Sequence, residues 1–293
     1  MTALLRAQNL SKRFGGLQAL SEVSFDIQAG EIYGLIGPNG AGKTTLFNVL
    51  TGLYVPESGR CVFDGEILLG RKPHEVAHAG LARTFQNIRL FANLSAIENV
   101  MIGRHVRTHA GVLGAVFRTR AQREEEAAIE AHAHRLLDYV GIGARANDVA
   151  RSLSYGDQRR LEIARALATD PKLLALDEPA AGMNASETRV LRGLIEKIRD
   201  DGVTVLLIEH DMKLVMGLCD RVLVLEYGKV LAMGRPAEVQ KDPRVIEAYL
   251  GAGAAAGATA GAAAGATAGA AAGAAAAAVP PPAGGTSRRE GAR

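Results

Sequence analysis

The fold of this chain is decided by the stretch Gly37-Pro38-Asn39-Gly40-Ala41-Gly42-Lys43-Thr44, which matches the phosphate-binding pattern G-x-x-x-x-G-K-[ST]. The apolar residues 32–36 before it are typical of a buried strand, and residues 43–50 after it of the start of a helix. Glycines let the backbone turn its N–H groups toward anionic oxygens, and the helix directs the positive end of its dipole at them. A chance Gly-rich turn would not place every fixed position between these two elements. The stretch therefore predicts nucleotide binding.

Three side chains at the end of this stretch have predicted tasks. Lys43 is expected to reach the β- and γ-phosphates and so to contribute to catalysis. The Thr44 hydroxyl is placed to bind Mg²⁺, and Thr45 continues the set of nucleotide contacts.

A second segment, more than a hundred residues on, indicates which kind of phosphate-loop protein this is. The run Leu153-Ser154-Tyr155-Gly156-Asp157-Gln158 leads directly into a predicted helix over residues 158–167. The apolar stretch that follows ends in two carboxylates, Asp177 and Glu178. With the phosphate loop, this order resembles the ATP-binding cassette (ABC) proteins, whereas small GTPases, kinases and most helicases lack it. The resemblance covers residues 1–250 and implies an ATP hydrolase that uses ATP and Mg²⁺.

Predicted strands alternate with helices over residues 1–250, which favours an α/β fold with a largely parallel sheet covered on both faces. We expect a phosphate-loop NTPase core beside an antiparallel β layer. Residues from about 95 to 165 are expected to form a helical subdomain, with 122–139 as one of its helices. The strands expected for the main sheet are 32–36, 81–85, 172–176, 203–208 and 222–226, and those for the antiparallel layer are 4–10, 23–27 and 62–63.

Composition agrees with one sizeable domain, since 48% of the 293 residues are hydrophobic. No run of about twenty strongly apolar residues predicts a membrane span, and we do not expect residues 1–6 to begin a signal peptide, since they have no apolar stretch of useful length. Cys61 and Cys219 lie far apart and outside any C-x-x-C pattern. We therefore expect neither a disulfide framework nor a thiolate metal site. This cysteine usage favours a location in a reducing cytosol.

The net charge of +3 is a poor indicator of nucleic-acid binding. Arg288, Arg289 and Arg293, set against Glu290, account for two of the three net charges. The remainder has no basic block that would neutralise a row of phosphates, so nucleic acid is not an expected partner.

From Gly251 onward the composition changes to Ala and Gly, and the octet Gly-Ala-Ala-Ala-Gly-Ala-Thr-Ala occurs at 253–260 and again at 261–268. Such a segment has almost no side chain to bury, so burial does not offset the entropy of ordering its backbone. A membrane helix is disfavoured because Ala and Gly have little transfer energy. Residues 251–293 are therefore expected to be a disordered tail.

Three residues at the ends of apolar strands make up the expected catalytic group. Asp177 ends the strand that places a carboxylate near Mg²⁺ in phosphate-loop enzymes. By resemblance, Glu178 orients the attacking water, and His210 is the switch histidine that touches the γ-phosphate. Alone, the acidic pair would be consistent with a solvated turn and the histidine with an ordinary surface residue. A buried acidic pair without a cation is unfavourable, however, which argues against a purely structural role.

Two further positions are assigned by resemblance. Gln86 matches the glutamine that ligates Mg²⁺ and links the core to the helical subdomain. Phe14 matches the aromatic residue that stacks on adenine, although a core or edge-strand phenylalanine is the plain alternative.

Ser154 and Gly156 are expected to act on the nucleotide of a second subunit. If they lie on the helical subdomain, they do not reach the phosphate loop of their own chain. In the family each ATP is held between the loop of one subunit and the Ser154 segment of the other, in a two-fold sandwich. ATP binding closes this sandwich and hydrolysis opens it.

Three residues depart from the general family pattern. Tyr155 replaces a common glycine, Asp157 a common glutamine, and Asn184 the usual aspartate, which puts the contact of that last loop across the dimer in doubt. These departures narrow the choice within the family. Residues 153–156, 178–184 and 84–91 together resemble one of the two ATP-binding subunits of bacterial branched-chain amino acid importers, the one with the longer helical insert.

This resemblance implies partners and a location. The expected partners are a homologous ATPase subunit or a second copy of the chain, two membrane permeases and, indirectly, a periplasmic binding protein. The chain would lie peripherally at the cytoplasmic face of the inner membrane. Selectivity for the substrate lies in those partners, so the residues of this chain leave the substrate open.

Two rival functions remain open from the sequence. The first is the ATPase of a lipid, lipopolysaccharide or urea ABC transporter, although the lipopolysaccharide enzymes usually have Leu-Ser-Gly-Gly-Glu where this chain has residues 153–157. The second is a non-transport ABC ATPase, which generally needs a long coiled-coil insertion or a second cassette.

Overall fold

The computed structural model describes residues 3–107 and 120–249, which belong to one compact unit. The predicted tail, 251–293, lies outside the described residues. No described helix is both long enough and apolar enough to cross a membrane.

A six-stranded sheet forms the centre of the unit, with strand order β10-β9-β3-β8-β7-β6. Five neighbouring strands are parallel, and β10 joins one edge antiparallel to β9. This arrangement confirms the predicted α/β core with a mainly parallel sheet. The strands are β3 (Ile32–Ile36), β6 (Leu81–Arg83), β7 (Leu173–Asp177), β8 (Thr204–Ile208), β9 (Arg221–Glu226) and β10 (Lys229–Gly234).

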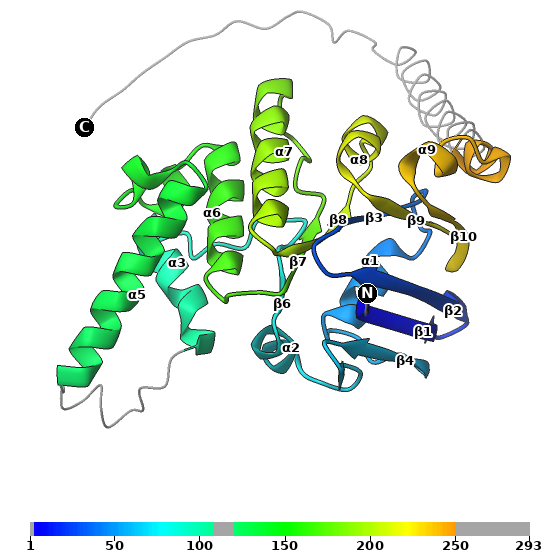
Figure 1. Ribbon diagram of the computed structural model, residues 1–293, viewed down its shortest axis with the longest axis horizontal. Coiled ribbons are helices and arrows are strands. Elements are labelled where there is room, and N and C mark those ends of the chain that lie inside the picture. Colours follow the sequence, from blue (N-terminus) through cyan, green and yellow to red (C-terminus); the bar gives the residue numbers. More distant parts are fainter. Residues whose placement is uncertain (1–2, 108–119, 250–293) are drawn as a thin grey trace, which may run out of the picture. The chain divides into compact units, whose positions relative to one another are not determined.

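Both faces of this sheet are covered, as the continuous apolar runs of its strands predict. Successive side chains of a strand point to opposite faces, so Leu174 and Leu176 of β7 join one hydrophobic cluster while Leu173 and Ala175 join the other. The first cluster includes residues of the helices on one side of the sheet. The second includes helix α1 and the antiparallel strands on the other side (Figure 1). The helices on the sheet are α1 (Lys43–Leu50), α7 (Ala185–Asp200) and α8 (Met212–Leu218).

The antiparallel layer has four strands in the order β2-β1-β4-β5. Its first two strands form a long hairpin joined at residues 15–16. The prediction of an antiparallel layer is confirmed, although its strands are longer than expected. They are β1 (Ala3–Phe14), β2 (Leu17–Gln28), β4 (Ser58–Phe63) and β5 (Glu66–Ile67).

Three helices, α3, α5 and α6, gather beyond the β6 edge of the central sheet (Figure 1). They share the first hydrophobic cluster with the sheet through residues such as Val100, Leu137 and Leu161. The helix predicted over 122–139 is present as α5, whereas the division of the chain into a core and a helical subdomain stays a prediction. The elements here are α3 (Ala96–Arg104), α5 (Arg120–Tyr139) and α6 (Tyr155–Leu167), with the short turns η1 (His105–Arg107), η2 (Gly143–Arg145) and η3 (Ala150–Ser152).

Two features of the main sheet differ from expectation. Strand β6 ends at Arg83 instead of residue 85, because the chain leaves the sheet after the Thr84 N–H donates to the carbonyl of Ala175. Strand β10 was not predicted. Half of its residues are exposed and none is fully buried, so it lacks the apolar run that marks the central strands. The small remaining helices are α2 (Pro73–Ala79) and α9 (Pro236–Val239), and residues 243–249 are also helical.

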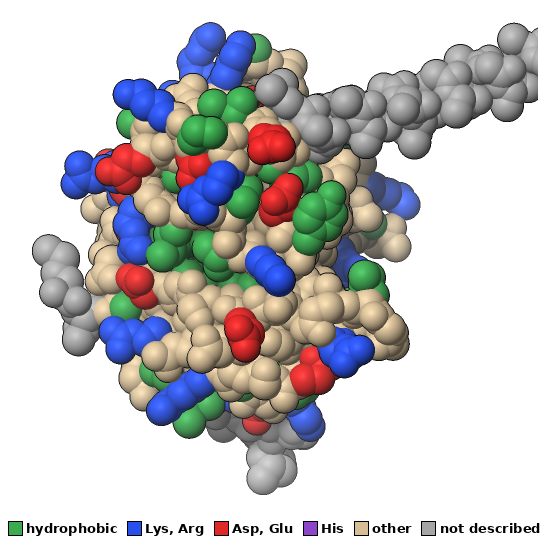
Figure 2. Space-filling model, turned by 90° about the vertical axis from the view of Figure 1, so that its right-hand side faces the viewer, with side chains coloured by type: hydrophobic (Ala, Val, Ile, Leu, Met, Phe, Trp, Pro, Cys, Tyr) green, Lys and Arg blue, Asp and Glu red, His purple; other side chains and the backbone are tan. Residues whose placement is uncertain are grey.

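Charged side chains of both signs are interspersed on the face that includes β10 and the β1–β2 hairpin (Figure 2). The mixture of signs leaves this face without a strong field of one sign. Among the described residues, Lys12 is paired with Glu57 at 2.9 Å and Arg221 with Asp26 at 3.2 Å.

Helix α3 approaches α6 closely at a glycine. A methyl group at Gly103 would lie 2.2 Å from the carbonyl oxygen of Arg165, so Gly103→Ala forces the two helices apart. We expect this change to lower the free energy of unfolding by about 1–3 kcal/mol. Gly193 of α7 has no neighbouring atom within 4 Å of such a methyl group, so Gly193→Ala should instead raise stability by roughly 0.5–1 kcal/mol. Guanidinium unfolding followed by circular dichroism measures both, and equal effects of the two substitutions would contradict the close packing.

Candidate functional site

The glycine-rich loop lies between β3 and α1, as predicted. Its first residue, Gly37, passes so close to β9 that a methyl group there would sit 2.2 Å from the carbonyl oxygen of Leu225. Gly42 ends the loop with φ of 100° and caps α1. Only glycine is compatible with both positions.

Lys43 is almost fully buried, and its ammonium donates to the carbonyls of Gly37 (2.7 Å) and Pro38 (2.9 Å). The amine therefore lies inside the curve of the loop. Burial lowers the pKa of Lys43, and the negative charges of Glu178 and Asp177 act in the opposite direction. An anion held by the loop would further favour the charged amine.

A cleft of about 1040 Å³ opens over this loop. It brings together residues that the sequence analysis placed in one site although they lie in distant segments. The predicted residues that line it are Phe14, Asn39, Gly40, Ala41, Gly42, Lys43, Thr44, Thr45, Gln86, Glu178 and His210.

Glu178 is the centre of the predicted catalytic group. Its carboxylate accepts a hydrogen bond from the Gln86 amide at 2.8 Å, and its other oxygen lies 2.6 Å from Nε2 of His210. The backbone of Glu178 has φ of 47°, in the left-handed region that a non-glycine residue rarely adopts. Its N–H donates to the carbonyl of Ile208 on the neighbouring strand, which fixes this conformation. A strained backbone held at such a position is typical of functional sites.

Asp177, the last residue of β7, is buried behind Glu178. Burial raises the pKa of Asp177, and the charge of Arg83 opposes this rise most strongly among the nearby groups. Burial also raises the pKa of Glu209, whose carboxylate accepts hydrogen bonds from the backbone N–H groups of Ala180 and His210. Glu209 thus fixes the turns that position both Glu178 and His210.

Phe14 also lines the cleft and is 42% exposed. Its ring meets Tyr54 edge-on, with ring centroids 5.3 Å apart, and the ammonium of Lys12 lies 5.2 Å from its centroid. The ring is therefore supported from its surroundings and still open to a ligand, which agrees with a stacking platform better than with a core residue.

Four lining residues were missed by the sequence analysis: Leu17, Gln18, Ala19 and Tyr227. Tyr227 occupies the turn between β9 and β10, is 83% exposed and has φ of 44°. The next residue, Gly228, donates its N–H to the carbonyl of Ala41, so this turn is bonded to the phosphate loop. The dipeptide Tyr227-Gly228 after a predicted strand was the available signal, since glycine there indicates a turn.

Ser154 and Gly156 are not among the residues that line the cleft. Ser154 caps α6, and its hydroxyl accepts from the N–H of Asp157 at 3.2 Å. A methyl group at Gly156 would lie 3.1 Å from the carboxylate of Glu187 at the start of α7. Tyr155, between them, faces Gly182 in the loop after Glu178.

Asn184, which replaces the usual aspartate, caps helix α7. Its side-chain oxygen accepts hydrogen bonds from the N–H groups of Ser186 (2.9 Å) and Glu187 (3.0 Å). The carboxylate of Glu187 in turn accepts from the N–H of Asn184 at 2.9 Å, which completes a capping box. Because only the amide oxygen is used, aspartate would form the same bonds.

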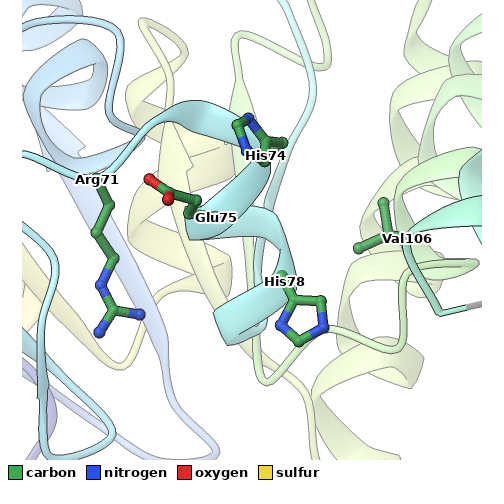
Figure 3. A pocket seen from close by; sticks show the side chains of 5 residues that line it. All are labelled: Arg71, His74, Glu75, His78 and Val106. Atoms are coloured by element: carbon green, nitrogen blue, oxygen red, sulfur yellow. The ribbon is translucent and has the colours of Figure 1, made fainter.

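A separate pocket lies beside α2, lined by Arg71, His74, Glu75, His78 and Val106 (Figure 3). The two histidines and the glutamate come from one short helix and point in different directions. Within 3–107 and 120–249, no group of three or more His, Cys, Asp or Glu side chains is arranged to hold a metal ion.

Comparison with known families agrees with this geometry. Residues 20–181 match the family model described as "ABC transporter". Residues 229–255 match a second model, described as "Branched-chain amino acid ATP-binding cassette transporter".

Individual relatives extend this similarity to most of the chain. The high-affinity branched-chain amino acid transport ATP-binding protein BraF of Pseudomonas aeruginosa is 47% identical over 250 residues, which cover 85% of this chain and 98% of BraF. The lipopolysaccharide export system ATP-binding protein LptB of Acidithiobacillus ferridurans is 37% identical, over 86% of this chain and 98% of LptB. The crystal structure of the ADP conformation of MJ1267, an ATP-binding cassette of an ABC transporter, has a TM-score of 0.75 and 32% identity, over 86% of this chain and all of that chain. The chain therefore belongs to the ATP-binding proteins of the ABC transporter family.

The cap of α7 leads to a prediction. Asn184→Ala removes the acceptor of two backbone N–H groups and should lower the free energy of unfolding by about 1 kcal/mol. Asn184→Asp keeps the acceptor and should change stability by only a few tenths of that amount. Chemical unfolding of the two variants beside the wild type checks this, and a loss of stability in the aspartate variant as large as in the alanine variant would rule out the cap as the role of Asn184.

Proposed function

We propose that this chain is the ATP-binding and ATP-hydrolysing subunit of an importer for branched-chain amino acids. The observation that carries the hydrolytic part is the placement of Glu178, held between Gln86 and His210 at the edge of the cleft over the phosphate loop. The match of residues 229–255 to a branched-chain amino acid transporter family, and the 47% identity to BraF, support the substrate class.

The phosphates of ATP would occupy the curve of the glycine-rich loop, where the backbone N–H groups and Lys43 are directed. In this arrangement the ammonium would exchange its bonds to the carbonyls of Gly37 and Pro38 for bonds to phosphate oxygens. Phe14 would stack on the adenine, since its ring is one of two exposed aromatic rings that line the cleft, the other being Tyr227.

The predicted Mg²⁺ ligands fit that ion chemically. Thr44, Gln86 and Asp177 offer hydroxyl, amide and carboxylate oxygens, which are the ligands that Mg²⁺ prefers. The Gln86 amide nitrogen donates to Glu178, which leaves its oxygen for a cation. Bound there, Mg²⁺ would neutralise charge on the phosphate oxygens. The raised pKa of buried Asp177 is consistent with a carboxylate whose charge awaits a cation.

Glu178 would accept a hydrogen bond from the attacking water and orient it toward the γ-phosphate. His210, on the neighbouring strand end, holds the carboxylate through its Nε2 and faces the same cleft. Gln86 restrains the second carboxylate oxygen. The side chains of Gln86 and His210 thus fix the direction of the Glu178 carboxylate, which must contact the water.

A second subunit would complete the site. Ser154 and Gly156 lie at the start of α6 and outside the lining of this cleft, so they are available to the nucleotide of a partner. We propose the two-fold sandwich, formed with a homologous ATPase subunit or with a second copy of this chain.

The membrane permeases would dock in a groove next to Gln86. This groove, of about 360 Å³, is lined by apolar side chains of several elements, among them Leu53, Phe85, Phe91 and Ile102. It also has two arginines, Arg83, whose Nη1 donates to Asn48 and Thr51, and Arg165. A helix of a permease with apolar residues and one carboxylate would match this lining. Binding would place the chain peripherally at the cytoplasmic face of the inner membrane, and a periplasmic binding protein would act on it only through the permeases.

The ATPase subunits of the rival transporters would differ from the proposed importer subunit in their membrane partners and not in their chemistry. A lipid, lipopolysaccharide or urea transporter would use the same cleft, and LptB shares 37% of its aligned residues with this chain. The higher identity to BraF and the match of residues 229–255 favour the amino acid importer. A non-transport ABC ATPase would leave the apolar groove without a use.

Glu178→Gln should slow ATP hydrolysis by about a hundredfold or more while ATP affinity is retained, because the substitution replaces the charged carboxylate with a neutral amide, a weaker acceptor for the attacking water, and leaves the phosphate loop intact. Phosphate release measures hydrolysis, and the fluorescence of a labelled ATP analogue measures binding. The full-length chain is the sample.

Lys43→Ala is the matched variant, since it should lose ATP affinity instead. Near-normal hydrolysis by Glu178→Gln would overturn the role of the carboxylate. Unchanged affinity in Lys43→Ala would overturn the assignment of the loop.

Phe91→Ala should weaken the association with permeases without changing ATP binding, because this ring is 48% exposed in the groove and away from the nucleotide cleft. Co-purification with co-expressed permeases of a branched-chain amino acid importer measures the association. Val190→Ala is the control, since Val190 is equally apolar and 55% exposed but lies on α7, outside the groove. Equal co-purification of the Phe91 variant and the wild type would contradict docking at this groove.

A further inference from the structure

Helix α6 contains an ion pair that is fully buried. Arg159 and Glu162 are one helical turn apart, with Nη1 and Oε2 separated by 3.0 Å, and their side chains are 0% and 1% exposed. The neighbouring Arg160 is partly exposed and pairs instead with Asp157. Burial of two charges is unfavourable unless further hydrogen bonds satisfy them, so the partners of this pair show what it holds.

Those partners are backbone groups of the loop that follows β6. The guanidinium of Arg159 donates to the carbonyls of Phe85 and Gln86, each at 2.6 Å. Oε1 of Glu162 accepts from the N–H groups of Phe85 (3.3 Å) and Arg89 (3.4 Å). One ion pair therefore holds donors and acceptors of residues 85–89 together, and we call it the loop clamp.

Gln86 is held by hydrogen bonds through both its backbone and its side chain. Its carbonyl is bonded to the loop clamp, while its amide donates to the carboxylate of Glu178. A shift of the backbone at residue 86 would therefore move the amide relative to Glu178. The loop clamp is two hydrogen bonds from the catalytic carboxylate.

Tyr155 connects the same guanidinium to a second loop. Its phenol lies 3.1 Å from Nη2 of Arg159, and its ring edge lies 3.4 Å from the position of a methyl group on Gly182. Gly182 belongs to the loop between Glu178 and the cap of α7. Tyr155, which replaces a common family glycine, thus connects the loop 85–89, through Arg159, to the loop 180–184 that follows Glu178.

We propose that the loop clamp, together with Tyr155, is a positioning device for catalysis: it sets the backbone at Gln86 so that the Gln86 amide orients Glu178. This inference rests on the proposed hydrolysis of ATP. It assigns to Tyr155, Arg159 and Glu162 a part in turnover, although none of them lines the nucleotide cleft. Phe85, which the clamp holds by both backbone groups, also lines the apolar groove, so occupation of that groove acts on Gln86 through the same bonds.

Loss of the loop clamp should affect kcat and KM for ATP differently. Because the clamp orients a group for the chemical step and does not touch the nucleotide, its loss should lower kcat about tenfold and change KM for ATP by less than about twofold. Arg159→Gln removes the paired donors, and Arg159→Lys, with one compact ammonium, should recover only part of the rate. Tyr155→Phe removes a single hydrogen bond, and its effect on kcat should be smaller and in the same direction.

The controls are matched in chemistry and position. Arg160→Gln changes the adjacent arginine of the same helix, and Tyr139→Phe removes a phenol whose partner is Asp201, at 2.5 Å. Both should retain the kcat of the wild type. Steady-state ATP hydrolysis by the full-length chain provides kcat and KM for every variant.

A single substitution leaves one buried charge without its partner and can prevent folding. The double variant Arg159→Met/Glu162→Leu removes both charges and fills a similar volume, so it should fold. Amide hydrogen exchange locates the effect: the peptide over residues 84–92 should exchange faster in this variant, while the peptides of β7 and α7 keep the protection of the wild type. The kcat of this variant should fall as in Arg159→Gln.

Two results would overturn the inference. The first is an unchanged kcat in the folded double variant. The second is a rise in KM at constant kcat, which would indicate a role in nucleotide binding instead. Failure of the proposed function is distinguishable, because it would appear as absence of ATP hydrolysis by the wild type in the same assay.

Discussion

Adjacency of parallel strand ends is the constraint on which the site depends. Strands β3, β8 and β7 are neighbours and run in the same direction, with Leu35 paired to Ile208 and Ile208 paired to Asp177. Their carboxyl ends therefore open on one edge of the sheet, where ligands bind in open α/β folds. The glycine-rich loop, the carboxylate pair and His210 follow these three strands. Residues more than a hundred positions apart meet because backbone hydrogen bonds hold their strands in register.

This constraint also explains how much was predictable. Each strand before a predicted site residue is a short, wholly buried run, which the sequence displays directly. The expectation that Lys43, Glu178 and His210 lie together agrees with the lining of one cleft, and their roles stay predictions. Tyr227 was not anticipated, because its position depends on a hairpin whose second strand, β10, is largely exposed. The buried member of the pair Arg159 and Arg160 was equally hidden, since two adjacent arginines look alike in a sequence. Only packing of α6 against the loop after β6 distinguishes them.

Buried charge is concentrated where the site needs fixed geometry. The side chains of five charged residues around the proposed catalytic group are nearly inaccessible to solvent: Lys43, Asp177, Arg159, Glu162 and Glu209. Burial is unfavourable for every one of them, and it moves the pKa of Lys43 down and those of Asp177 and Glu209 up. The pair in α6 is bonded to backbone groups of the protein, and only Nε of Arg159 is left without a hydrogen bond, whereas the buried ammonium of Lys43 lies inside a loop suited to phosphate. The first kind of burial fixes position and the second kind favours a charged ligand.

Helix α6 is connected to the proposed catalytic group through two loops, 85–89 and 180–184. The start of α6 contacts the loop 85–89 through Arg159 and Glu162, and the loop 180–184 through Tyr155. Glu178 is tied to the first loop by Gln86 and directly precedes the second. Since Ser154 and Gly156 lie at this same end of α6, a nucleotide that draws them toward a partner subunit also pulls on both loops. Closure of two subunits and orientation of the catalytic carboxylate would then be one movement, because the same helix end carries the contacts for each.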